Sequence, residues 1–142
     1  MFHKVLLPLD LQETELTDRA VALTKDIAAR YQSEITVLTV IPDFGMAMVA
    51  SYFPEDAFKK AHDDVCAELK RIIESRFDDP KSIKCEVLQG KPHKEIVRYA
   101  KEHGSDLIIM PARANDVGKL LLGSSTEHVV GRAPCSVLVI RT

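Results

Sequence analysis

The sequence predicts an α/β fold, in which an open five-stranded parallel sheet is covered by helices on both faces. Short apolar runs alternate along the chain with longer segments in which apolar residues recur at helical spacing. Most of the short runs are apolar on both sides of the expected strand, which is typical of a parallel sheet buried above and below. The length of 142 residues suits one domain, which we expect to comprise residues 1–142.

The expected strands are five apolar runs: Val5–Leu7, Ile35–Ile41, Ile83–Leu88, Leu107–Met110 and Val137–Ile140. Right-handed crossovers between parallel strands place the intervening helices on both faces of the sheet. We expect the strand order 3-2-1-4-5 of a Rossmann-like fold. A ligand would then bind beyond the carboxyl ends of the first and fourth strands, where the strand order reverses.

Four helices are expected between these strands. Apolar residues recur at helical spacing over Leu16–Ile27 and again over Phe58–Phe77. A third helix is bounded by Pro92 in its first turn and by Gly104 just past its end. The fourth begins near Ser124 and ends near residue 131. No internal repeat, low-complexity tract or linker interrupts this pattern.

Charge and cysteine content exclude several classes of protein. The 19 basic and 21 acidic residues give a net charge of −2 without a basic cluster, so we expect no nucleic-acid binding. The three cysteines, Cys66, Cys85 and Cys135, have neither the number nor the spacing of a disulfide framework or a zinc site. They are interpreted as small buried apolar residues in a reducing compartment. With no segment long enough for a signal peptide or a bilayer span, we expect a soluble cytoplasmic protein without membrane insertion.

Several phosphate and catalytic motifs are absent. Gly118–Lys119 lacks the upstream glycine and the following Ser or Thr of a P-loop, and the acidic turn Asp10–Glu13 lacks the glycines of a dinucleotide fingerprint. The acids and the lysine of a receiver domain are not in place. The five histidines are scattered without partners at suitable spacing, so each is interpreted as a surface or hydrogen-bonded residue. We therefore predict neither catalytic residues nor a metal site.

The stretch Met110–Ser125 has the outline of an anion site. It leaves the fourth strand through a polar loop and enters the fourth helix at Gly123–Ser125, where unpaired N–H groups and the helix dipole favour an anion. A second interpretation is equally compatible with the spacing. Ser124 and Glu127 fit a capping box, with Ser124 as the N-cap of a helix that holds no ligand.

Six segments covering nearly every strand and connection resemble one known family. They are Lys4–Asp10, Leu38–Pro42, Gly90–Ile96, Ser105–Met110, Leu121–Ser124 and Val129–Val139. The last of these is the most specific. On these segments the chain resembles the universal stress protein family from end to end. The resemblance implies an adenine nucleotide alpha hydrolase-like fold and a dimeric regulator of the stress response rather than an enzyme.

In that family ATP, where it binds, lies across the ends of the first and fourth strands. The resemblance implies these nucleotide-binding residues: Pro8, Leu9, Asp10, Val40, Met110, Pro111, Arg113, Gly123, Ser124 and Ser125. Pro8, Leu9 and Asp10 would lie beside the nucleoside, and the backbone of Val40 would contact the adenine. Met110 would form the pocket wall. Gly123, Ser124 and Ser125 would face the phosphates. The implied cofactor is ATP or another adenine nucleotide, with Mg²⁺ as its candidate companion. The alternative role of Asp10 is helix capping.

The loop departs from the ATP-binding pattern. Pro111 and Ala114 stand where that pattern has glycines, and neither replaces a glycine well, because proline has no N–H and alanine rarely adopts positive φ. Either the phosphate cradle is weaker, or Arg113 and Lys119 supply charge in place of backbone amides. An ordinary solvated role for Arg113 is the alternative. A nucleotide-free dimeric scaffold and a slow ATP hydrolase therefore remain beside the nucleotide-responsive regulator.

Two surfaces suggest protein partners. The last strand, Ser136–Ile140, is expected at a sheet edge and is apolar on both faces, which favours a homodimer through Val137, Leu138 and Val139. The segment Ile41–Pro54 resembles the one found in stress proteins associated with TRAP-type transporters, which implies a membrane transporter as a partner. The alternative is that this segment packs over its own dimer.

Overall fold

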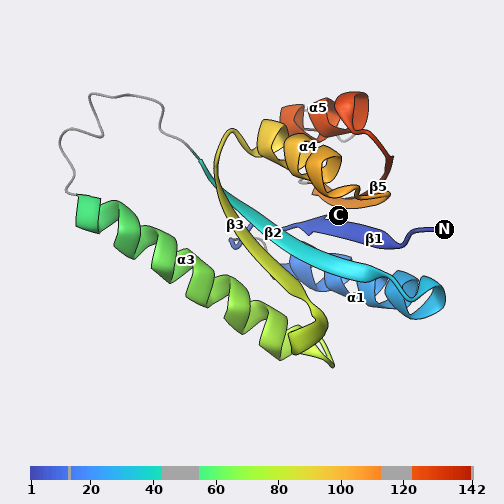
Figure 1. The fold of residues 1–142 in the computed structure, drawn as a ribbon, viewed down its shortest axis with the longest axis horizontal. Helices are drawn as coiled ribbons and strands as arrows, with labels where there is room; N and C mark the ends of the chain where they lie inside the picture. The colour runs from blue at the N-terminus through green and yellow to red at the C-terminus, as the bar shows by residue number, and fades with distance from the viewer. Residues whose placement is uncertain (13, 43–54, 113–122, 142) are drawn as a thin grey trace.

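The computed structural model describes residues 1–12, 14–42, 55–112 and 123–141 (Figure 1). Strands and helices alternate along the chain. In order they are β1 (Lys4–Pro8), α1 (Thr14–Tyr31), β2 (Glu34–Pro42), α3 (Glu55–Arg76), the 3-10 turn η1 (Pro80–Ser82), β3 (Lys84–Gly90), α4 (Pro92–His103), β4 (Leu107–Ala112), α5 (Ser124–Arg132) and β5 (Ser136–Arg141).

The five strands form one parallel sheet in the order β3-β2-β1-β4-β5, which confirms the expected fold class and strand order. The strand β1 lies in the middle. Its residue Leu6 is in register with Thr36 of β2 on one side and with Ile108 of β4 on the other. The chain crosses from β1 to β2 on one side and reaches β4 on the other side from β3 through α4, so the strand order reverses at β1 and a crevice opens at its carboxyl end.

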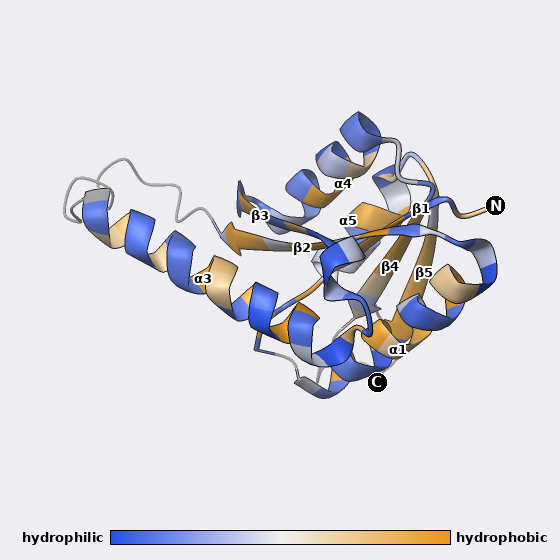
Figure 2. Ribbon diagram, turned by 60° about the horizontal axis from the view of Figure 1, so that its bottom comes forward, coloured by the Kyte–Doolittle hydropathy of each residue, from blue (hydrophilic) through white to orange (hydrophobic). Residues whose placement is uncertain are grey.

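The sheet is covered on both faces, with α1 and α3 on one side and α4 and α5 on the other (Figure 1). Side chains alternate between the two cores along each strand. Leu7 of β1 belongs to the core under α1 and α3, whereas Leu6 belongs to the core under α4 and α5, and both are fully buried. Figure 2 shows the sheet as apolar and the outer faces of the helices as polar.

Local sequence explains the ends of α4. Pro92 occupies the first turn, where its missing N–H has no helical partner to lose. The helix ends at Gly104, which adopts φ 68° in the left-handed region that favours glycine. The bounds expected for this helix are thus confirmed.

The start of α5 differs from the expected capping box. Gly123 is the N-cap, with φ −60° and ψ 154°, and Ser124 is already helical. As a glycine, this N-cap has no side chain that could make a capping hydrogen bond. The prediction of Ser124 as N-cap is therefore wrong, because the chain turns into the helix one residue earlier than the spacing suggested.

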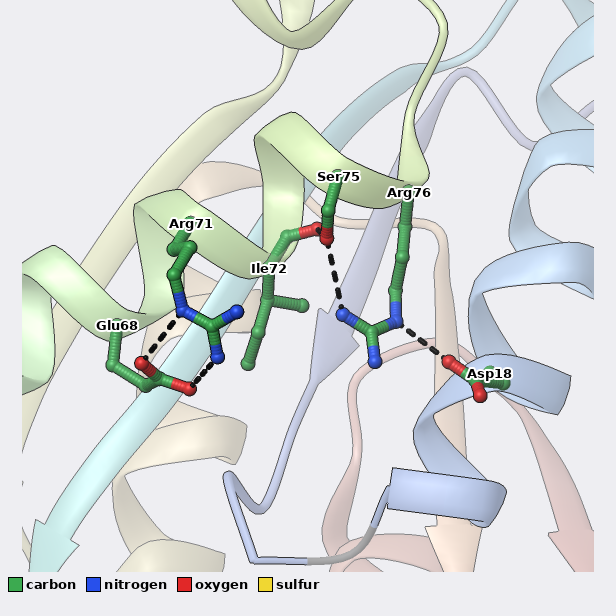
Figure 3. Close-up of polar contacts among 6 residues, drawn as sticks. All are labelled: Asp18, Glu68, Arg71, Ile72, Ser75 and Arg76. Carbon is green, nitrogen blue, oxygen red and sulfur yellow. Dashed lines mark hydrogen bonds and ion pairs between the residues drawn. The ribbon is translucent and has the colours of Figure 1, made fainter.

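The carboxyl end of α3 is bound to α1. Arg76 donates from Nε to Asp18 Oδ1 of α1 at 2.6 Å, as Figure 3 shows, and Lys25 Nζ donates to the carbonyl of Arg76 at 3.1 Å. Leu69 is fully buried, whereas every residue from 56 to 64 is exposed. The apolar stripe expected over Phe58–Phe77 therefore packs on the sheet only in its second half.

Two glycines give a matched test of helix termination. We expect Gly104→Ala to destabilise the protein by about 1 kcal/mol, because alanine must enter the left-handed region. Gly131→Ala is the control, since Gly131 lies in α5 and a Cβ there meets nothing within 4 Å. It should stabilise by up to about 1 kcal/mol. Urea unfolding measures the free energy of unfolding of both variants. Equal changes of the same sign would contradict the role of Gly104 as the left-handed residue that ends α4.

Candidate functional site

A cleft of about 550 Å³ opens at the carboxyl ends of the central strands. Its walls come from the ends of β1, β2 and β4, from the amino ends of α1, α4 and α5, and from the turn that follows β1. It lies at the switch point of the strand order, where ligands bind in open α/β sheets. The fold therefore places the cleft where the sequence predicted it.

Hydrogen bonds between neighbouring strands fix the floor of the cleft. The Leu9 N–H donates to the carbonyl of Leu38 at 2.8 Å, which extends the pairing of β1 with β2 by one residue. The buried Thr39 hydroxyl donates to the carbonyl of Leu9 at 2.9 Å. The chain leaving β1 is thus held rigidly beside β2, so Asp10 emerges at a fixed position on the rim.

Asp10 forms a turn rather than a helix cap. Its Oδ1 accepts the N–H of Gln12 at 3.0 Å, while α1 begins only at Thr14. The Asp10 side chain is exposed and lines the cleft. A carboxylate held in this way presents an acceptor to hydroxyl or amino groups of a ligand.

The amino end of α5 forms the polar wall of the cleft. Gly123, Ser124, Ser125 and Thr126 all line it. The first N–H groups of a helix have no partners within the helix and carry the positive end of its dipole. Among the described residues, no atom lies within 4 Å of a Cβ placed on Gly123, so these residues leave its backbone open to close approach from the cleft.

Apolar side chains complete the opposite part of the cleft. Val40, Met110 and Ile96 line it, with Pro42 and Pro92 at the ends of their elements. This combination of an apolar wall, a carboxylate and a helix amino end suits a ligand with a flat apolar part, hydroxyl groups and an anionic part. The cleft brings together no acid-base pair or activated nucleophile among the described residues.

The cleft gathers every residue that the sequence analysis put forward for the nucleotide, except Arg113. They are Pro8, Leu9, Asp10, Val40, Met110, Pro111, Gly123, Ser124 and Ser125. Arg113, Ala114 and Lys119 lie outside the described residues, as does most of the segment Ile41–Pro54. The structure thus assembles residues from distant parts of the sequence around one cavity.

Other cleft residues were missed by the sequence analysis. Thr39 and Thr17 are buried polar residues near strand and helix ends, and Pro92 and Ile96 come from α4. The available indication for Thr39 was a threonine set between apolar residues in the carboxyl-terminal half of β2. Nothing in the local sequence indicated that α4 reaches the cleft, because this contact depends on how α4 packs.

The described part of the chain also bears on metal ligands, membrane helices and cysteines. No group of three potential metal-ligating side chains occurs there, and no helix in it is long and apolar enough to cross a bilayer. All three cysteines are free, but each is only partly buried rather than fully buried as expected. Cys66 lies near the middle of α3, just after the exposed stretch of residues 56–64.

Comparison with known proteins agrees with the architecture. The family model described as the universal stress protein family matches residues 1–141. The chain belongs to this family. Universal stress protein G of Shigella flexneri is similar, with 30% identity over 145 residues that cover 99% of this chain and 100% of that protein.

Solved structures of this family share the fold. The universal stress protein UspA from Lactobacillus plantarum superposes with a TM-score of 0.73 at 27% identity, covering 99% of this chain and 98% of that chain. A universal stress protein in complex with cAMP superposes with a TM-score of 0.67 at 22% identity, covering 99% and 98%. The second likeness establishes the fold alone.

The Thr39 hydroxyl offers a test of the cleft floor in this member of the universal stress protein family. We expect Thr39→Val to lower stability by about 1–3 kcal/mol, because the Leu9 carbonyl loses a buried donor. Thr24→Val is the matched control, since Thr24 donates to the carbonyl of Ala20 within its own helix and that carbonyl keeps its helical bond. In urea unfolding, a larger loss for Thr24→Val would contradict this role.

Proposed function

We propose that the chain binds an adenine nucleotide in the cleft and acts as a nucleotide-responsive regulator rather than as an enzyme. The observation that carries this proposal is the cleft itself, which joins an apolar wall to the open amino end of α5. The proposal treats residues 1–142 as one cytoplasmic domain of the stress response. The cAMP complex of a protein with the same fold is consistent with an adenine nucleotide.

The chemistry of the cleft suits the three parts of such a ligand. Val40 and Met110 provide an apolar surface for the adenine. Asp10 offers its carboxylate to the ribose hydroxyls, and the N–H groups beside Gly123 face the phosphates. Pro111 has no N–H to offer, so we assign part of the phosphate binding to Arg113, with Mg²⁺ as a companion of a triphosphate.

A regulator is favoured over the two alternatives for separate reasons. Hydrolysis needs a positioned base or water and charge stabilisation at the transferred group, and the described cleft residues provide no base beyond the turn-forming Asp10. A nucleotide-free scaffold has no use for an open glycine at a helix start. Nucleotide occupancy would report the energy state of the cell to a protein partner.

We also propose a homodimer formed through β5. This strand pairs only with β4 among the described residues and so lies at an edge of the sheet. Leu138 is 38% exposed, and Val137 and Val139 are only partly buried on the opposite face. An apolar edge of this kind pairs with another chain unless it is protected.

The partner of the regulator is proposed from the sequence resemblance. The segment Ile41–Pro54 resembles that of stress proteins associated with TRAP-type transporters, so a membrane transporter is the candidate partner. The two ends of this segment join β2 to α3, whose exposed first half is available to the same partner. Packing of the segment over the dimer is the alternative.

Nucleotide binding is tested by thermal unfolding. A ligand that binds only the folded state at 100 times Kd adds roughly 2.7 kcal/mol, so MgATP should raise Tm on the order of 5 °C or more. Gly123→Val should abolish the shift, because a branched side chain occupies the space where phosphate approaches. The unliganded Tm should fall only slightly, since a Cβ at Gly123 meets no atom of the described residues within 4 Å.

The same assay separates two models of the phosphate cradle. A large loss of affinity in Arg113→Ala assigns the anion to this side chain, whereas no loss assigns it to the amides of α5. If ATP, ADP and AMP at millimolar concentration all leave the Tm of the wild-type protein unchanged, the scaffold alternative replaces the regulator.

Assembly is tested by sedimentation velocity. We expect the wild-type protein to be a dimer at micromolar concentration and Val139→Lys to be a monomer or an aggregate, because a charge would be buried at the paired edge. Val130→Lys is the control, since Val130 is 46% exposed on α5 and lies outside the proposed interface. A monomeric wild-type protein would refute the proposal.

A further inference from the structure

Two histidines from different helices are in contact on the face of the sheet that α4 and α5 cover (Figure 1). The imidazole rings of His93 in α4 and His128 in α5 have centroids 4.1 Å apart, and their planes are tilted by 49°. Both side chains are half-buried. The two helices share one core, in which Ile96 and Val129 are buried. The ring contact therefore joins two helices that already pack on the same part of the sheet.

A proton on His93 would lie among positive groups. His93 is in the first turn of α4, and the amino end of a helix carries the positive end of its dipole. Burial is the largest cause that lowers the pKa of His93. Four basic side chains lower it further, namely His128, Lys94, Lys91 and Arg132. The fold thus favours the neutral ring.

The carboxylates on the elements around His93 do little to offset such a charge. Glu95 of α4 is paired with Arg98. Glu86 of β3 accepts a hydrogen bond from the Tyr99 hydroxyl at 3.5 Å. Glu127 is exposed and directly precedes the histidine of α5, and adjacent residues of a helix do not face each other. A positive charge on His93 therefore gains little from these three acids.

We propose that the contact between His93 and His128 is a proton-sensitive junction of α4 with α5, which is closed when the His93 ring is neutral and loosens when that ring takes up a proton. Pro92 at the start of α4 and Ser124 and Ser125 at the start of α5 line the cleft. Loosening of the junction would therefore alter the cleft wall. The junction would respond to protons whether the cleft is empty or occupied.

Proton linkage gives the direction of the effect. In the unfolded chain His93 titrates near its ordinary pKa of 6.5, whereas in the folded chain its pKa is lower. The unfolded chain binds more protons in the pH interval between these two pKa values, so the free energy of unfolding falls as the pH is lowered through it. The stability that a neutral His93 contributes is complete at pH 8 and is lost below the folded-state pKa.

Hydrogen exchange with mass spectrometry measures the junction locally. The Glu95 N–H donates to the Lys91 carbonyl, and the Glu127 N–H donates to the Gly123 carbonyl, each at 3.0 Å. These bonds close the first turns of α4 and α5. We expect the peptides that contain these amides to lose protection several-fold from pH 8 to pH 5, after correction for the pH dependence of intrinsic exchange. Peptides from α1, on the opposite face of the sheet, should lose less.

Three variants assign the response to the His93 proton. His93→Gln keeps a polar side chain that cannot be protonated, so most of the pH-dependent loss of protection should disappear. His93→Lys places a charge at the same position, so its α4 and α5 peptides should be less protected than those of the wild type already at pH 8. His62→Gln is the matched control, because His62 lies in the exposed start of α3, and it should retain the wild-type response.

NMR titration of the histidine ring protons tests the same group directly. The signal of His93 is assigned by its absence in His93→Gln, and that of His128 by its absence in His128→Gln. We expect the pKa of His93 in the wild-type protein to lie below 6.5. Its pKa should rise towards this value in His128→Gln, because one of the groups that disfavour the proton has been removed.

Four outcomes would overturn the proposal. They are a wild-type response that persists in His93→Gln, wild-type protection of His93→Lys at pH 8, a His93 pKa at or above 6.5, and a loss of wild-type protection at pH 8 on addition of EDTA. The last would show that the two rings hold a metal ion rather than respond to protons. Circular dichroism melting establishes that each variant is folded at pH 8, and the titration of the wild-type protein decides where one is not.

Discussion

The pairing of β1 on both of its edges is the constraint on which the rest of the structure depends. Hydrogen bonds to β2 and β4 fix β1 at the centre of the sheet, and Leu6 and Leu7 anchor the two cores on its opposite faces. Because β1 has β2 on one side and β4 on the other, the strand order reverses at β1 and a crevice opens at its carboxyl end. The cleft is the direct consequence, and the extra bond from Leu9 to Leu38 gives it a rigid floor.

The cleft offers apolar contact on one side and anion binding at a helix amino end on the other. Its apolar wall and its helix amino end come from different elements, so one ligand must join the two to use both. In this chain the glycine that opens the helix start is present, whereas the strand-to-loop junction carries Pro111. Backbone donors are thus concentrated on α5. Any anion in the cleft depends more heavily on that helix and on the side chains of the loop than it would with glycines on both sides.

The remaining surface features lie away from the cleft and serve other purposes. Among the described residues, the edge strand β5 pairs only with β4 and presents apolar side chains, which suit association with another chain. The helix α3 is held at one end by Arg76 and Lys25 and projects at the other.

The sequence by itself determined the type and order of the elements, the strand order and the cleft position. Hydrophobic periodicity is a local property that reveals each helix and strand, and the handedness of the crossovers restricts how these elements can be connected. It also supplied the cleft residues that lie at strand ends, such as Asp10 and Met110. Only the tertiary structure decided that Gly123 rather than Ser124 caps α5, since the cap depends on the direction in which the chain arrives. It also decided that Pro92 and Ile96 reach the cleft and that residues 56–64 of α3 stay exposed. These features depend on how segments far apart in the sequence pack together in space. No local pattern of residues encodes that packing.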